Sequence, residues 1–235
     1  MAPSTTSATA PALHPVERAC SAWLEVSFDG NRCIHARQCV TGSPATFLSD
    51  VDGPWILPAL TPLHDLIAVI RNCPSGALSY RRLDGGAPEP APQVNLLAVR
   101  ENGPYAVRAR ITLAGEAPAP MATPVVYRAT LCRCGKSRRK PFCDNTHRRI
   151  GFEATGEPAS GNTTALIVRD GPLEIAPQPD GPLEVRGSLE IVSGTGRCVE
   201  RCTTATLCRC GASRNKPFCD DSHLRIGFRS QEESP

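Results

Sequence analysis

The chain of 235 residues lacks several features that mark common protein classes. No stretch reaches 18 consecutive apolar residues, which excludes a helix that crosses a membrane. The first fifteen residues, MAPSTTSATAPALHP, have neither a charged start nor an apolar run, so we expect no secretory signal. Aromatic residues make up only 5% of the chain, and large packed cores are therefore not expected.

Charge and catalytic motifs are equally sparse. The net charge of +3 is too small to indicate nucleic-acid binding. The sequence has no Gly-rich phosphate loop, no flavin motif and no arrangement of nucleophile, base and orienting residue. We therefore expect a soluble, cytoplasmic protein that is not an enzyme and binds neither nucleic acid nor membranes.

Cysteine, in contrast, is abundant. The chain has twelve cysteines, and nine of them fall into three groups with spacings typical of metal ligands. This grouping favours a reducing compartment over a secreted disulfide scaffold.

One segment of 16 residues occurs twice, at 132–147 and 208–223. Each copy opens with Cys-x-Cys, ends with Pro-x-Cys-Asp-x-x-His, and supplies three thiolates and one imidazole, a ligand set for zinc or an iron-sulfur cluster. In an extended segment, side chains two apart point the same way, so both sulfurs of Cys-x-Cys can reach one metal. The second Cys and the His stand four apart, which predicts one face of a helical turn. We also expect Pro141 and Pro217 in the first turn of that helix, so that its partly positive end lies near an anionic cluster.

Both segments resemble the motif of the CDGSH (mitoNEET-like) family of 2Fe-2S proteins, Cys-x-Cys-x2-Ser/Thr-x3-Pro-x-Cys-Asp-Gly-Ser/Ala/Thr-His. The resemblance implies that the Cys-x-Cys pair binds one iron and the Cys-His pair the other, which assigns Cys132, Cys134, Cys143 and His147 to one cluster and Cys208, Cys210, Cys219 and His223 to a second. The family's Gly is Asn145 in one copy and Asp221 in the other. Because a helical turn does not require Gly, we expect binding to survive there, with altered electrostatics near the outer iron.

The alternative is a pair of zinc knuckles that only stabilise the fold. Zinc sites usually open with Cys-x2-Cys or Cys-x4-Cys, and the Cys-x-Cys opening is atypical of them. Colour distinguishes the two, since an iron-sulfur protein is red-brown and a zinc protein is colourless.

The two segments belong to a duplicated domain. Equivalent ligands are 76 residues apart, and short strands are predicted at 96–99 and 105–113. We expect an α+β chain in which a small ferredoxin-like α+β domain precedes a mainly β duplicated region. The expected division is a disordered tail (1–15), a ferredoxin-like domain (16–83), a linker (84–93), a first repeat (94–155) and a second repeat (156–230). CDGSH proteins are twofold dimers, so the resemblance implies an intramolecular pseudo-twofold dimer and a monomeric chain.

The N-terminal unit carries a third group of cysteines. Cys33, Cys39 and Cys73 follow the spacing of bacterial ferredoxins, except that Ala36 stands where the second Cys is expected. With an apolar helix predicted before Cys73, residues 24–80 are similar to the divergent 4Fe-4S mono-cluster ferredoxins. Three cysteines permit a 3Fe-4S cluster, or a 4Fe-4S cluster with a non-Cys ligand, for which His35 is the nearest candidate. The alternative is a metal-free domain whose thiols pack in the core.

Cys198 and Cys202 form a further pair just before the second motif. The first repeat has Val126 at the position of Cys202, so the fold does not require it. The pair is interpreted as packing thiols, with a redox-sensing or disulfide-forming pair as the alternative.

The ligand set indicates the chemistry. One neutral imidazole in place of a thiolate leaves a 2Fe-2S site less negative, which raises its reduction potential above that of a four-Cys site. A His ligand can also be protonated, so the cluster should be pH-labile. We expect single-electron transfer to a redox partner protein, with an iron-sulfur cluster or iron carrier that donates to an apo acceptor as the alternative. The segment 132–149 has a net charge of +6 against +2 for 208–225, which suggests that the first site has the higher potential and faces an acidic partner.

Overall fold

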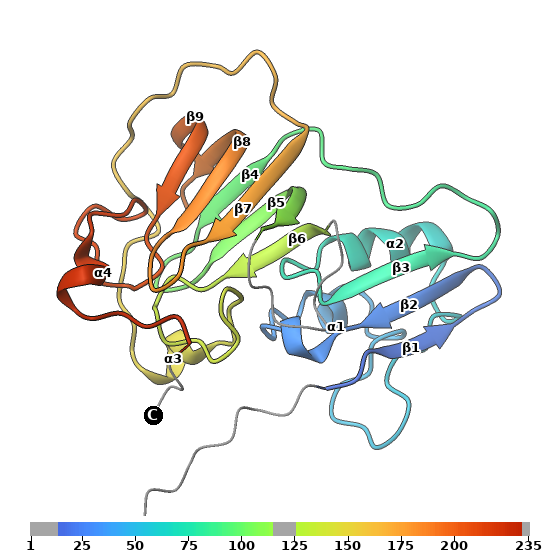
Figure 1. Ribbon diagram of the computed structural model, residues 1–235. Helices are drawn as coiled ribbons and strands as arrows, with labels where there is room; N and C mark the ends of the chain where they lie inside the picture. Colours follow the sequence, from blue (N-terminus) through green and yellow to red (C-terminus); the bar gives the residue numbers. More distant parts are fainter. Residues whose placement is uncertain (1–13, 115–125, 232–235) are drawn as a thin grey trace, which may run out of the picture.

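The structure is a computed structural model that describes residues 14–114 and 126–231. A small N-terminal α+β domain is followed by a β-rich region, which confirms the expected fold class (Figure 1). The predicted disordered tail lies almost entirely outside the described residues. Among the described residues, no helix is both long and apolar enough to cross a membrane.

The N-terminal domain packs helices against a three-stranded antiparallel sheet in the order β1-β2-β3. Its elements are β1 (Glu17–Cys20), β2 (Leu24–Phe28), the 3-10 turn η1 (Gly30–Arg32), α1 (Gln38–Gly42), α2 (Leu63–Arg71) and β3 (Leu78–Arg82). Helix α2 is the apolar helix predicted before Cys73. It buries Leu66 and Ile70, four apart on one face, against Leu24 and Leu78 of the sheet.

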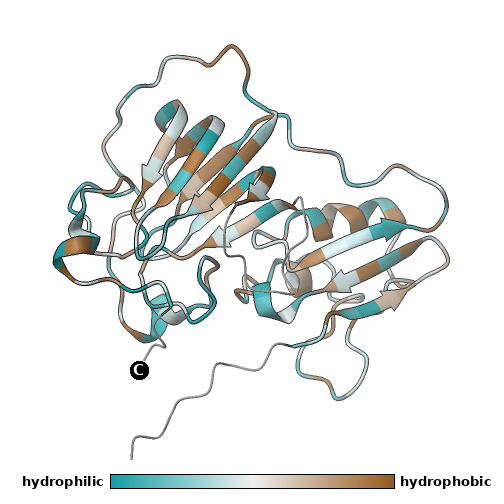
Figure 2. Cartoon of the chain, viewed as in Figure 1, coloured by the Kyte–Doolittle hydropathy of each residue, from teal (hydrophilic) through white to brown (hydrophobic). Residues whose placement is uncertain are grey.

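The β-rich region contains six strands and two single-turn helices. They are β4 (Leu96–Val99), β5 (Tyr105–Leu113), β6 (Val126–Leu131), α3 (Thr146–Arg149), β7 (Pro172–Pro177), β8 (Leu183–Val192), β9 (Cys198–Leu207) and α4 (Ser222–Arg225). The strands predicted at 96–99 and 105–113 are confirmed as β4 and β5. Apolar and polar residues alternate along several of these strands, as expected when one face of a sheet is buried (Figure 2).

The strands of the two repeats pair with one another in a single sheet. Within each repeat the strands pair in antiparallel fashion, β4–β5–β6 and β7–β8–β9. Between the repeats, β4 pairs in parallel with β8, and β5 pairs in parallel with β7. Strand β4 is equivalent to β7, and β5 is equivalent to β8. If each strand is replaced by its equivalent, the β4–β8 pairing becomes the β7–β5 pairing. We infer the pseudo-twofold arrangement from this relation.

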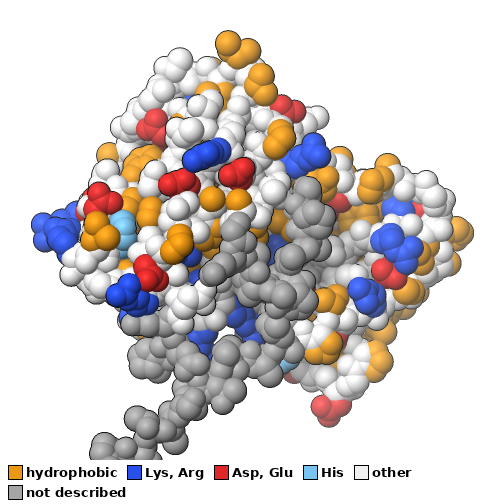
Figure 3. Space-filling view, viewed as in Figure 1, with side chains coloured by type: hydrophobic (Ala, Val, Ile, Leu, Met, Phe, Trp, Pro, Cys, Tyr) orange, Lys and Arg blue, Asp and Glu red, His pale blue; other side chains and the backbone are white. Residues whose placement is uncertain are grey.

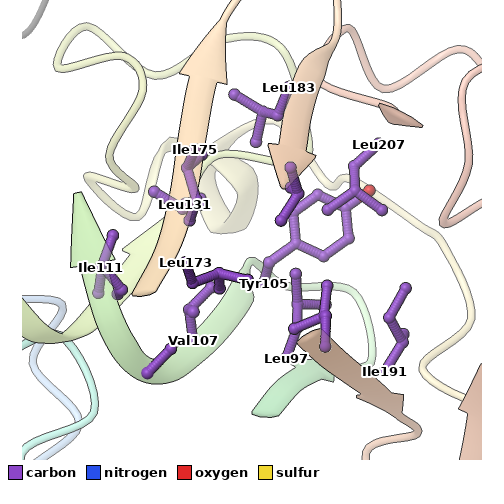
Figure 4. Packing of buried hydrophobic residues seen from close by; sticks show 14 of the residues in the cluster. Leu97, Tyr105, Val107, Ile111, Leu131, Leu173, Ile175, Leu183, Ile191 and Leu207 are labelled. Atoms are coloured by element: carbon purple, nitrogen blue, oxygen red, sulfur yellow. The ribbon is translucent and has the colours of Figure 1, made fainter. Parts of the chain in front are cut away.

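The hydrophobic core between the repeats contains buried side chains from both of them. In Figure 4, Tyr105 and Leu97 of the first repeat lie among Leu183, Leu207 and Ile191 of the second. All five side chains are fully buried. Neither repeat can therefore bury its apolar face without the other, which is the expected solution for units of this size.

The two prolines of the motifs do not lie in helices, and this prediction was wrong. Pro141 and Pro217 each follow a cis peptide bond in a turn, and helices α3 and α4 begin five residues later. Each proline carbonyl instead accepts the backbone N–H of the first Cys of its motif, at 2.8 Å for Cys132 and 2.9 Å for Cys208. The prolines therefore shape the turn that brings the motif back on itself, and the helix-end argument for the cluster does not apply.

Candidate metal centres

The Cys-x-Cys openings bring their sulfurs together as predicted. The Sγ atoms of Cys132 and Cys134 lie 3.7 Å apart, and those of Cys208 and Cys210 lie 3.8 Å apart. All four residues are buried. Each pair follows directly on a buried strand end, β6 or β9, which fixes its position.

The second halves of the motifs also meet. His147 Nδ1 lies 3.4 Å from Cys143 Sγ, and His223 Nδ1 lies 3.4 Å from Cys219 Sγ. The pairs are close for a different reason from the one predicted, because each Cys precedes its helix and only the His lies in it.

The two halves of each motif are joined by a short antiparallel bridge. Leu131 pairs with Phe142, and Cys143 N–H donates to Thr130 O at 2.9 Å. The second motif repeats this arrangement with Leu207 and Phe218. The four ligands of each motif are thereby brought to one place, and negative charge on Cys132 contributes to raising the pKa of Cys143.

These separations test whether the residues fit a metal. Two sulfurs on one tetrahedral metal, with bonds of about 2.3 Å, stand about 3.8 Å apart, and a sulfur and an imidazole nitrogen about 3.6 Å apart. The protein places both kinds of pair within about 0.2 Å of these values. Each pair therefore fits the coordination shell of a metal, and the donor set of three thiolates and one imidazole suits an iron-sulfur cluster or zinc.

Two polar residues that the sequence analysis overlooked hold the loop between the ligands. Ser137 Oγ donates to Phe142 O at 2.6 Å, and Asp144 accepts the backbone N–H groups of Arg138 and Thr146 at 2.9 and 3.0 Å. The second motif makes the same bonds through Ser213 and Asp220, at 2.7 to 3.0 Å. Their recurrence at equivalent positions of both repeats was the signal that could have identified them.

The expectation that the family's Gly position needs only a helical turn was also wrong. Asn145 and Asp221 have φ of 67° and 60°, in the left-handed region, where Gly, Asn and Asp are the favoured residues. This conformation directs the backbone N–H of each toward the preceding cysteine sulfur, at 3.4 Å in both motifs. The substitutions are therefore compatible with the site, and the reason is conformational.

The environment sets the protonation of the ligands. A hydrogen bond from Cys134 lowers the pKa of Cys132, and one from Cys210 lowers the pKa of Cys208. Burial raises the pKa of Cys143 to about 12. Burial also lowers the pKa of His147, which favours the neutral imidazole that a metal needs. Each motif thus offers one easily ionised thiol as a first ligand.

The two motif loops lie back to back. Gly135 has φ of +78°, and a Cβ built on it would lie 2.3 Å from Cys210 O; Gly211 has φ of +85°, and its Cβ would lie 2.7 Å from Cys134 O. Only Gly permits this approach. Tyr105 completes the contact, because its buried Oη lies 2.9 Å from both Cys208 O and Pro217 O.

An arginine between the two cysteines of each opening is buried rather than exposed. The guanidinium group of Arg133 donates to four backbone carbonyls, those of Gly103, Thr155, Arg100 and Ala154. Arg209 donates likewise to the carbonyls of Gly181 and Gln178. Both are buried structural cations that tie the ligand loop to the preceding hairpin, so the net charge of each motif overstates its surface charge by one unit, and the difference between the motifs is unchanged. On the face shown in Figure 3, basic and acidic side chains are interspersed.

The two centres differ in exposure. His147 is only 8% exposed and Cys143 only 3%, whereas Cys219 and His223 are half-buried. Exposed Leu224 and Asp221 border the second centre. The first centre is therefore an interior site and the second a surface site.

The three N-terminal cysteines meet around a cavity. Cys33, Cys39 and Cys73 line a space of about 260 Å³, with Ala36 and His35 also on its wall. Each of Cys33 and Cys39 has a pKa raised mainly by burial and further by the charge of Cys73. The cavity is largely apolar and wide enough for a small inorganic cluster.

The remaining cysteines lie apart from these centres. Cys198 and Cys202 lie four residues apart in β9, so their Cα atoms are about 13 Å apart. A disulfide needs less than about 7 Å, so the two cannot be joined in this fold. Burial raises the pKa of Cys202 to about 11, which supports a packing role. Cys20 is exposed on β1.

Comparison with known proteins agrees with this inventory. A family model described as "Iron-binding zinc finger CDGSH type" matches residues 102–148 and 180–224, and one described as "Divergent 4Fe-4S mono-cluster" matches residues 22–83. The proteins named "Uncharacterized protein YjdI" in Escherichia coli K12 and in Escherichia coli O157:H7 are each 38% identical to this chain over 58 residues, which cover 25% of this chain and 75% of theirs. The matched segments contain all eleven predicted ligands. The chain therefore belongs to the CDGSH iron-sulfur domain family, with two CDGSH segments behind an N-terminal domain of the divergent 4Fe-4S mono-cluster type.

Proposed function

We propose that this iron-sulfur protein transfers single electrons and is not an enzyme. It would hold two 2Fe-2S clusters in its two Cys3His sets and a 3Fe-4S or 4Fe-4S cluster at Cys33, Cys39 and Cys73. The observation that supports this most strongly is that each repeat brings together three cysteines and one histidine of the CDGSH-type segment as two pairs at metal-coordination separations.

A bound cluster would supply a centre that accepts and releases one electron. The chain's own residues tune that property. Backbone N–H groups at 3.4 Å from Cys143, Cys210 and Cys219 stabilise negative charge on sulfur. The neutral imidazole removes one negative charge from each set, and both effects raise the reduction potential.

The first experiment is anaerobic purification with iron and acid-labile sulfide counts and electron paramagnetic resonance. Three distinct signals after graded reduction are expected. His147→Cys and His223→Cys variants assign the two Cys3His sites, because a fourth thiolate should lower the potential of the altered site alone. A colourless, sulfide-free protein that contains zinc would reject the proposal.

Cluster donation is the second candidate, favoured by the half-exposed Cys219 and His223. An acceptor protein could reach these ligands, while Cys143 and His147 are covered. Donation predicts transfer of the second centre's cluster to an apo-ferredoxin and retention of the first. Retention of both clusters in the presence of the acceptor would exclude this role.

A further inference from the structure

The N-terminal domain touches the first motif through a set of contacts that the second motif does not make. Asn145 Nδ2 donates to Ile34 O at 2.8 Å, and Arg139 Nη1 donates to Asn31 O at 3.1 Å. The Arg32 guanidinium lies 5.5 Å from the centre of the Phe142 ring. The N-terminal ligand loop and the first motif therefore share an interface.

Asn145 contacts a ligand of the first motif and the residue next to a ligand of the N-terminal set. Its backbone N–H lies 3.4 Å from Cys143 Sγ, and its side-chain amide bonds the carbonyl of Ile34, the residue after Cys33. A single residue thus connects a ligand of the first CDGSH centre to the chain beside a ligand of the N-terminal centre. The connection consists of two hydrogen bonds and a few covalent bonds.

The equivalent residue in the second repeat shows what is specific to Asn145. Asp221 has nearly the same φ and makes the same backbone contact, to Cys219 Sγ at 3.4 Å. An ionised carboxylate has no hydrogen to donate to a carbonyl, and Asp221 is exposed. The amide at position 145 is therefore suited to the interface, and a carboxylate is not.

From this geometry we propose that Asn145 is the positioning residue that fixes the N-terminal centre against the first CDGSH centre as an electron-transfer pair. The inference rests on the proposed function. With clusters held at both centres, one electron would pass from the reduced centre to the oxidised one, with no bond change and no proton transfer. A low-potential one-electron donor protein supplies the electron to the pair.

The same arrangement orders the three centres along the molecule. The back-to-back contact of the motif loops places Gly135 against Cys210 and Gly211 against Cys134, so the first centre has one neighbour on each side. The interior first centre connects the N-terminal centre to the half-exposed second centre. Electrons would enter or leave the protein at the two ends of this series.

The test compares Asn145→Gly with the matched control Asp221→Gly. Gly tolerates the left-handed φ at both positions, so neither variant should disturb the fold. Asn145→Asp is a second variant, which keeps the side chain's shape and removes its donor. The full-length protein with its clusters is used throughout.

Two readouts are needed. In Asn145→Gly, amide hydrogen exchange across residues 33–39 should rise about 3- to 10-fold, the effect of losing one hydrogen bond. After flash reduction with a one-electron donor, freeze-quenched paramagnetic resonance should show slower equilibration between the N-terminal and first CDGSH signals. Both changes should appear in Asn145→Asp and be absent from Asp221→Gly.

Equal behaviour of Asn145→Gly and Asp221→Gly in both readouts would overturn the proposal. So would increased exchange at 33–39 without slower equilibration, because Asn145 would then be only a structural contact. Failure of the proposed function is distinguishable, since it would appear in the unaltered protein as missing iron and sulfide.

Discussion

Replacing Gly135 with Ala should separate the two motif loops and destabilise the protein more than left-handed strain alone can explain. A Cβ at this position would lie 2.3 Å from Cys210 O, a backbone atom that cannot rotate away. Gly151 provides the matched control, because its φ of +60° is also left-handed and nothing lies within 4 Å of its Cβ position.

The magnitudes follow from these two observations. Ala in the left-handed region costs about 1–2 kcal/mol at either position. Overpacking against the opposite loop adds about 1–3 kcal/mol for Gly135→Ala alone. For a chain of this size each kcal/mol lowers the melting temperature by about 2–4 °C, so the two variants should differ by about 2–12 °C.

The assay is thermal unfolding of the cluster-loaded protein, followed by circular dichroism and by visible absorbance. Gly211→Ala against Gly227→Ala repeats the test from the other side, since Gly211 approaches Cys134 O and Gly227 is open. Equal melting temperatures for Gly135→Ala and Gly151→Ala would refute the back-to-back contact of the two motif loops.

Three further predictions concern other parts of the structure. Tyr105→Phe should lose about 1–3 kcal/mol of stability in chemical unfolding, because its buried Oη lies 2.9 Å from two carbonyls, and no loss would mean that this hydroxyl is not needed there. Hydrogen bonding from an arginine lowers the pKa of buried Glu190, so its stabilisation is present above the unfolded pKa of about 4.3 and is lost as pH falls through the lower folded pKa. Glu190→Gln should therefore be less stable than wild type by about 1–3 kcal/mol at pH 7, with the difference vanishing in acid; a difference independent of pH would contradict this account. Cys198 and Cys202 should remain separate thiols under mild oxidation, and an intact mass two hydrogens lighter that maps to this pair would contradict the strand geometry.

The ligands and the duplication could be predicted from the sequence because both are local patterns. The spacing of Cys132 and Cys134 is short enough for the chain alone to bring the sulfurs together, and the repeat gave a second, independent instance. Strands β4 and β5 were equally predictable, since they alternate apolar and polar residues between turn signals.

The errors arose where tertiary contacts decide the conformation. The preference of proline for a first helical turn predicts a helix at Pro141, and the bridge between Leu131 and Phe142 overrides that preference. The net charge of segment 132–149 includes Arg133, and the carbonyls that bury this side chain come from residues far away in the sequence. The role of Asn145 depends on a contact with Ile34, 111 residues distant, which no local pattern can indicate.

Acid-labile sulfide in the anaerobically purified protein tests the central claim most directly. Two 2Fe-2S clusters and one 3Fe-4S or 4Fe-4S cluster predict about eight sulfides and about seven or eight irons in each chain. About four sulfides and four irons would contradict the N-terminal cluster, and a protein without sulfide would contradict the account as a whole.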